Sequence, residues 1–248
     1  MNNYKKLFYE KYEKTHVSSR EGQMNKKFFE KRKKMMQNMY MKYLPLNKDS
    51  KIIDLGCGYG EFIGALNDLG YSNTIGYDLG KDQIRKGRDL GVKNIHEKDF
   101  IELIESDEEK SKYDFVILRD VLEHFDKLDG LKIISNVHNI LKNQGKVLIQ
   151  VPNASSPLFG HIRYGDFTHD IAYTEGSLSQ ILRVTDFDNL KFYSFHSQTG
   201  ANKYNFINII KRFMSWIVNI FFKLLYLFEH NKFDVITSYN IIVLAQKK

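Results

Sequence analysis

The chain has 248 residues, of which 42% are hydrophobic, so it can form the core of one large domain, alone or with a small cap. Its single cysteine excludes a disulfide framework and a zinc cluster built from thiols, which is typical of the reducing cytosol. The net charge is +7, but residues 1–50 hold 13 Lys/Arg against 5 Asp/Glu. The basic excess therefore belongs to the N-terminal segment.

That segment is expected to form two helices, at about 4–14 and 22–43, because aromatic and methionine side chains recur there at helical spacing. We expect the pair to lie across a sheet edge with a lysine-rich face in solvent. Two alternatives stay open. The helices could form a lid over a bound ligand, or they could attract phosphate groups of a nucleotide-linked substrate or a nucleic acid.

Residues 52–62 predict a buried strand, a tight turn and the start of a helix. After Asp54 come glycines at alternate positions, Gly56, Gly58 and Gly60, with Cys57 between the first two. Glycines let a backbone approach a ligand closely, and a helix N-terminus supplies free N–H donors. A glutamate stands where the dinucleotide-binding fingerprint has its third glycine, and no phosphate-binding Gly-Lys-Ser/Thr follows. Asp54 could equally be a structural cap of the strand.

Further strands are expected at 73–78, near 92–97, and at 113–118 and 145–152. The second ends at Asp78, 18 residues beyond Gly60, close to the spacing at which a carboxylate can accept hydrogen bonds from both hydroxyls of a ribose. A turn-forming role is the alternative for Asp78. The third strand leads to Asp99 and Phe100, and the fourth ends at Arg119.

Together these stretches resemble the motifs of class I S-adenosylmethionine-dependent methyltransferases, over about residues 50–198 and a last strand near 240. The resemblance implies a Rossmann-like, seven-stranded, mostly parallel sheet with helices on both faces, an N-terminal helical lid and a helical insert before the last strand. The glycine loop would hold the methionine half of S-adenosylmethionine. The implied cofactor-binding residues are Asp54, Gly56, Cys57, Gly58, Gly60, Asp78, Leu79, Asp99, Phe100, Arg119, Tyr12 and Arg32.

A long loop, residues 152–174, precedes a predicted helix at 175–183. It resembles the acceptor loop of methyltransferases that act on small molecules, quinone precursors and sugars of bacterial surface polysaccharides. Histidine suits proton removal at neutral pH, so His169 is the first candidate for a general base and His124 the second. The alternatives are a hydrogen bond that holds the loop for His169 and a supporting role for His124. The expected substrate-binding residues are His161, Arg163, Tyr164, Asp166 and Tyr173.

After a sixth strand, at about 189–196, an apolar stretch covers residues 206–228. Charged residues interrupt it, so we expect one or two helices rather than a membrane span. They would pack on the domain or in a homodimer, or lie in a membrane surface. We divide the chain into an N-terminal helical segment (1–49), a methyltransferase domain (50–204 with 236–248) and an apolar helical insert (205–235).

The sequence thus predicts a cytoplasmic enzyme, with membrane association as an alternative, that methylates an oxygen or nitrogen of a small acceptor. The expected acceptor is a phosphorylated or nucleotide- or sugar-linked precursor of a capsule or other surface polysaccharide. No metal site is predicted, because the sulfonium already activates the methyl group. Two other classes stay open: a nucleic-acid methyltransferase that uses the basic N-terminus, and a cofactor-binding partner subunit without turnover of its own.

Overall fold

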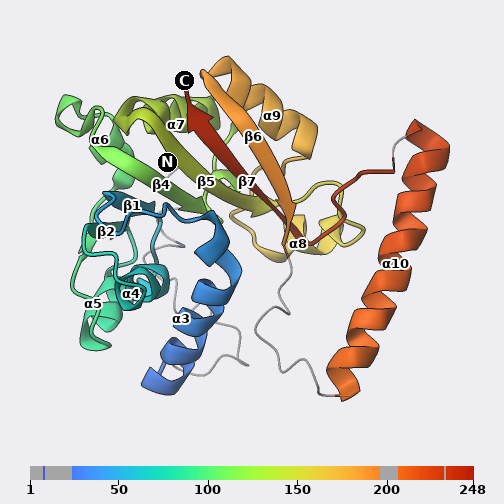
Figure 1. Cartoon of the computed structure of the whole chain (residues 1–248), viewed down its shortest axis with the longest axis horizontal. Coiled ribbons are helices and arrows are strands. Elements are labelled where there is room, and N and C mark those ends of the chain that lie inside the picture. Colours follow the sequence, from blue (N-terminus) through green and yellow to red (C-terminus); the bar gives the residue numbers. More distant parts are fainter. Residues whose placement is uncertain (1–7, 9–23, 196–205, 232) are drawn as a thin grey trace.

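The computed structural model describes residue 8 and residues 24–195, 206–231 and 233–248. Its centre is a seven-stranded sheet with the order β3-β2-β1-β4-β5-β7-β6 (Figure 1). The strands are β1 (Ile52–Leu55), β2 (Thr74–Asp78), β3 (Ile95–Glu97), β4 (Tyr113–Arg119), β5 (Leu141–Pro152), β6 (Phe187–Ser194) and β7 (Asn240–Lys247). Strand β7 runs antiparallel to β5 and β6, whereas the other pairs are parallel. The predicted mostly parallel, Rossmann-like sheet is therefore confirmed.

Helices cover both faces of the sheet, as Figure 1 shows. The first face carries α3 (Lys26–Tyr40), α4 (Glu61–Asp68) and α5 (Lys81–Asp89), and the second carries α6 (Phe100–Ile104), α7 (Lys127–Ile140) and α9 (Glu175–Val184). Successive residues of β4 alternate between the two cores, with Phe115 and Ile117 on the first and Val116 and Leu118 on the second. This period of two, apolar on both faces, is what a doubly covered strand requires.

Several boundaries differ from the expectations. The predicted helix at 22–43 is α3, which begins after its N-cap Asn25, followed by the 3-10 turn η1 (Met41–Tyr43). The predicted loop at 152–174 contains a short helix, α8 (Phe159–Gly165). Helix α9 begins where predicted, because Thr174 forms a capping box with Ser177. Apart from residue 8, the predicted helix at 4–14 lies outside the described residues.

The apolar insert forms one long helix, α10 (Phe206–His230), which stands apart from the sheet (Figure 1). Large side chains along it are exposed, among them Trp216, Phe221 and Phe228. Much of the apolar surface of this helix is therefore left uncovered by the described part of the chain, although Thr237 Oγ1 donates to Oδ1 of Asn219. No helix among the described residues has the length and apolar character to cross a membrane. The domain boundaries proposed above stay predictions.

Candidate active site

The sheet places the glycine loop where open α/β sheets bind ligands. Strand order reverses at β1, which lies between β2 and β4, and the loop follows the carboxyl end of β1. The φ angles of Gly56, Gly58 and Gly60 are +80°, +56° and +76°, which L-amino acids with a side chain rarely adopt. A Cβ on Gly56 would lie 2.5 Å from Cγ2 of Val121. The alternate glycines are thus required by the turn itself.

Cys57, between these glycines, is a packing residue. Its side chain is buried, and a Cβ added to Gly76 of β2 would lie 2.8 Å from its Sγ. Burial raises the pKa of the Cys57 thiol well above its ordinary value, so the thiol stays neutral. The contact ties the loop to the neighbouring strand.

Asp78, at the end of β2, organises the backbone around it. One carboxylate oxygen accepts the N–H of Gly58 at 2.8 Å, and the other accepts the N–H of Gly80 at 2.7 Å. Burial raises the pKa of Asp78, while these two hydrogen bonds act in the opposite direction. Each oxygen keeps a second lone pair, so the carboxylate can still accept the predicted ribose hydrogen bonds. Leu79, the next residue, is half-buried.

Asp54, directly before the glycine loop, and Arg119, at the end of the neighbouring strand β4, interact electrostatically. Asp54 is 1% exposed, and neither of its carboxylate oxygens has a hydrogen-bond partner in the described part of the chain. Burial raises its pKa to about 7, although the nearby charge of Arg119 lowers it. The Nε of Arg119 is likewise buried without a described partner. The Asp54 oxygens and the Arg119 Nε are costly to bury without partners, which marks a place prepared for a polar ligand.

Side chains of α3 and α4 contact Arg119. The guanidinium lies 5.3 Å from the ring centre of Tyr40 and 5.1 Å from that of Phe62, and its Nη1 lies 2.9 Å from Sδ of Met36. The Tyr40 hydroxyl donates to Oε1 of Gln150 on β5. The N-terminal helical segment therefore contributes directly to the wall of the site, through residues that the sequence analysis did not single out.

The other predicted cofactor contacts lie around this centre. The Nε of Arg32 on α3 donates to Oε1 of Glu61 at 2.7 Å, next to the glycine loop. Asp99 is the N-cap of α6, where its side chain accepts the N–H of Ile101 at 2.9 Å. Phe100 is buried against Phe125, with ring centres 6.3 Å apart. These placements leave the cofactor roles as predictions, and Tyr12 lies outside the described residues.

The two histidines predicted as proton acceptors come together although 45 positions separate them. Their ring centres are 4.8 Å apart. The loop reaches His124 because the N–H of Asp170 donates to the carbonyl of Glu123 at 2.7 Å, and because Thr168 Oγ1 lies 2.9 Å from His124 Nδ1. Burial lowers the pKa of His169, so the ring is neutral at physiological pH.

A pocket of about 600 Å³ opens beside His169. Its lining is Phe8, Arg163, Tyr164, Asp166, Phe167, His169 and Asp170, which includes four of the residues predicted on the acceptor side. The Arg163 guanidinium donates to the carbonyls of His169 and Asp170, so it holds the loop through backbone oxygens. Asp166 accepts the N–H and hydroxyl of Thr168 at 2.8 and 2.6 Å.

Two predicted substrate contacts lie away from this pocket lining. His161 is exposed on α8, whereas Tyr173 is buried against the sheet. Glu123, which was not among the predicted site residues, is 1% exposed, and its Oε2 has no hydrogen-bond partner among the described residues. Burial raises the pKa of Glu123 well above its ordinary value, and the Asp120 carboxylate adds to this. The sequence signal that could have identified Glu123 was its position directly before His124, in the turn that follows β4.

Comparison with known proteins agrees with this geometry. The model of a methyltransferase-domain family matches residues 27–191. An uncharacterised protein of Methanocaldococcus jannaschii is 28% identical over 130 residues, and the chain spans about half (52%) of the length of that curated relative.

Two solved structures share the fold over nearly the whole chain. A SAM-dependent methyltransferase from Archaeoglobus fulgidus is 21% identical with a TM-score of 0.64, over 99% of this chain and 100% of that one. The 1,6-didemethyltoxoflavin-N1-methyltransferase of Burkholderia thailandensis, solved with 1,6-didemethyltoxoflavin and S-adenosylhomocysteine, is 12% identical with a TM-score of 0.57, over 99% and 89% of the two chains. Since the family model matches well over half of the residues, from α3 into β6, the chain belongs to the methyltransferase-domain family.

Proposed function

We propose that this protein transfers the methyl group of S-adenosylmethionine to an oxygen or nitrogen of a small acceptor. The observation that carries the proposal is the buried carboxylate of Asp54, which has no described hydrogen-bond partner and stands directly before the glycine loop, within electrostatic reach of Arg119, whose Nε is also buried without one. The methionine end of the cofactor carries an ammonium and a carboxylate, which complement an aspartate and an arginine. The residues present therefore fit this cofactor.

Methyl transfer requires that the acceptor atom be aligned with the methyl group and that the acceptor lose a proton. The sulfonium activates the methyl group for an in-line displacement, and a positioned acceptor gains several kcal/mol over a free one, of the order measured for well-oriented reactions. Asp54, Arg119 and Asp78 would fix the cofactor. The acceptor's proton would be lost at the histidine pair, where His169 is the first candidate for a general base and His124 the second.

The acceptor is expected to occupy the pocket beside His169. The finer proposal, a phosphorylated or nucleotide- or sugar-linked precursor of a surface polysaccharide, rests on the resemblance of the loop at 152–174. Arg163 supports a phosphate contact only through N–H groups other than those that already donate to the two loop carbonyls. An acceptor screen should therefore include neutral sugars and phosphorylated ones.

A nucleic-acid acceptor is the weaker alternative, because part of the basic charge of α3 is paired within the chain. Arg32 contacts Glu61 at 2.7 Å, and Lys33 contacts Asp68 at 2.8 Å and Glu30 at 3.2 Å. Binding to phosphate backbones weakens steeply with salt. Tight RNA binding that falls steeply between low and physiological salt would favour this alternative over the small acceptor.

The exposed apolar side chains of α10 support two proposals about contacts: a homodimer, or peripheral attachment to a membrane. Sedimentation with and without anionic lipid vesicles separates them. A lipid-independent dimer indicates self-association, and co-sedimentation with vesicles indicates a membrane contact. A cytoplasmic location stays a prediction.

The central experiment is isothermal titration with S-adenosylmethionine and S-adenosylhomocysteine, on the wild type and on Asp78→Ala. Micromolar binding that collapses in the variant supports the proposed cofactor, and a screen of acceptors then tests turnover. Absence of binding to either compound by the folded wild type refutes the proposal. Full affinity without turnover on any acceptor would favour the partner-subunit alternative.

A further inference from the structure

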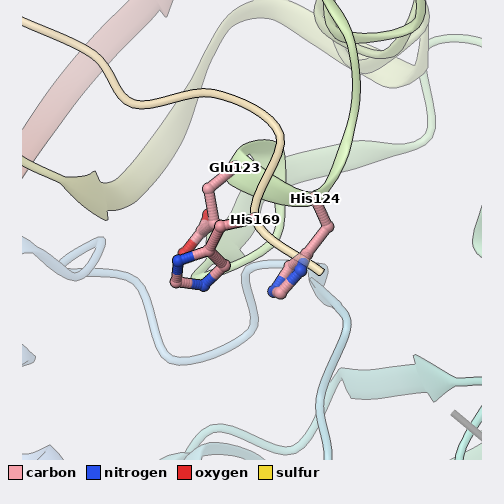
Figure 2. A group of neighbouring side chains, drawn as sticks. All are labelled: Glu123, His124 and His169. Atoms are coloured by element: carbon pink, nitrogen blue, oxygen red, sulfur yellow. The ribbon is translucent and has the colours of Figure 1, made fainter. Parts of the chain in front are cut away.

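Glu123, His124 and His169 form a cluster of metal-binding side chains. Glu123 and His124 are neighbours in the 3-10 turn η3 (Leu122–His124), and His169 approaches from the acceptor loop (Figure 2). One ligand atom of each residue lies within 4.8 Å of the others. The cluster borders the pocket, since His169 lines it.

Hydrogen bonds at Nδ1 determine which nitrogen of each ring can bind a cation. The Thr168 hydroxyl donates to Oδ1 of Asp166 at 2.6 Å, so at 2.9 Å from His124 it must accept the Nδ1–H of that ring. Nδ1 of His169 lies 3.1 Å from the carbonyl oxygen of Ile162, which can only accept. With Nδ1 donating in each ring, Nε2 is the nitrogen that would offer its lone pair to a cation, as in ligating histidines whose other nitrogen donates to a supporting oxygen.

The third candidate ligand, Glu123, has a carboxylate oxygen that no described contact accounts for. Oε2 of Glu123 is buried and has no hydrogen-bond partner in the part of the chain that the structure describes. An unpaired buried carboxylate oxygen is costly unless a cation or a proton satisfies it. Two imidazole lone pairs beside such an oxygen are the donor set of metal sites with three protein ligands and open positions.

We propose that Glu123, His124 and His169 bind one divalent transition-metal ion, of the class of Zn²⁺, Co²⁺ or Mn²⁺, at the border of the acceptor pocket. Building on the proposed function, the ion would bind the acceptor's hydroxyl oxygen and lower its pKa, so that the proton leaves to water. That oxygen then forms the new bond to the methyl carbon as the carbon–sulfur bond breaks. The electron pair stays on sulfur, and the products are a methyl ether and S-adenosylhomocysteine.

This site deepens the proposed function in one respect, because it selects the acceptor atom. A hydroxyl gains nucleophilic character when the ion lowers its pKa, whereas an amine would lose its attacking lone pair to the ion. The ion would therefore favour oxygen over nitrogen as the methylated atom. In this metal site, His124 and His169 act as metal ligands and not as general bases.

The test is titration of the full-length, chelator-treated protein with Co²⁺, followed by visible absorption and by calorimetry. We expect one equivalent to bind in the wild type. His169→Ala and Glu123→Gln should each weaken binding more than Thr168→Val, which removes only the oxygen that holds His124 and should cost about 10- to 100-fold. The matched control is His161→Ala, in the same loop but exposed, which should bind Co²⁺ as the wild type does.

S-adenosylhomocysteine affinity, measured on the same samples, separates this inference from the proposed function. Ligand binding by a wild type that takes up no Co²⁺ would overturn the metal site and leave the methyltransferase proposal standing. So would Co²⁺ affinity that is unchanged in both His169→Ala and Glu123→Gln. Site-specific Co²⁺ binding without affinity for S-adenosylhomocysteine would support the metal site and count against the proposed function.

Discussion

Replacing Asp54 by asparagine should remove a pH dependence from the stability of the ligand-free protein. Burial raises the pKa of Asp54 from its ordinary 3.8 to about 7. At about 1.4 kcal/mol per pH unit, this corresponds to about 4 kcal/mol of stability. Because the folded-state pKa is the higher one, that stability is present at low pH and is lost as the pH rises through 7.

The assay is urea unfolding of the wild type and of Asp54→Asn between pH 5 and 8. The difference between their unfolding free energies should change by about 2 kcal/mol from pH 5 to pH 7, with the wild type losing stability relative to the variant. Asp89→Asn, at an exposed position of α5, controls for the loss of an acidic charge. Parallel curves for wild type and Asp54→Asn over this range would refute the reasoning.

Saturating S-adenosylhomocysteine offers a second comparison for Asp54. If the ligand's ammonium pairs with this carboxylate, the bound wild type should show a flatter pH dependence than the free one, because the pairing lowers the pKa of Asp54. An unchanged slope in the presence of bound ligand would show that the ammonium lies elsewhere, and the assignment of Asp54 to the methionine end would be wrong.

Three further predictions concern the backbone and walls of the site. Gly56→Ala should lower the unfolding free energy more than Gly70→Ala, as measured by urea unfolding midpoints. Both φ angles are positive, but only at Gly56 would the new Cβ meet a neighbouring side chain, Val121, at 2.5 Å. Asp78→Asn should weaken S-adenosylhomocysteine binding at least about tenfold by calorimetry, since the amide replaces one acceptor oxygen of the buried carboxylate with a donor. Tyr40→Phe should cost about 1–3 kcal/mol of stability in thermal unfolding, because Oε1 of Gln150 loses its donor; no loss would mean that water replaces the hydroxyl.

The sequence determined the fold because each strand carries its own signal. Apolar residues on both faces predict a doubly covered parallel strand, and the positions of the glycines and of Asp78 at strand ends follow from local backbone requirements. The helix that begins after Thr174 is confirmed on this basis, and the mostly parallel sheet, which the family resemblance implied, is confirmed as well. The last strand was predicted by its place in the chain, near residue 240, and the structure inserts it between β5 and β6.

The sequence did not determine which side chains meet across the sheet's carboxyl edge. Asp54 and Arg119 come together because β1 and β4 are neighbours, and Tyr40 joins them because α3 packs over the same edge. The metal-binding cluster arises because the backbone of the loop at Asp170 bonds to Glu123. Such contacts depend on loop closure between distant residues, which no local pattern encodes. The strands and the glycine loop are thus properties of the sequence, whereas the proximity of Asp54 and Arg119 and the Glu123, His124 and His169 cluster are decided by tertiary packing.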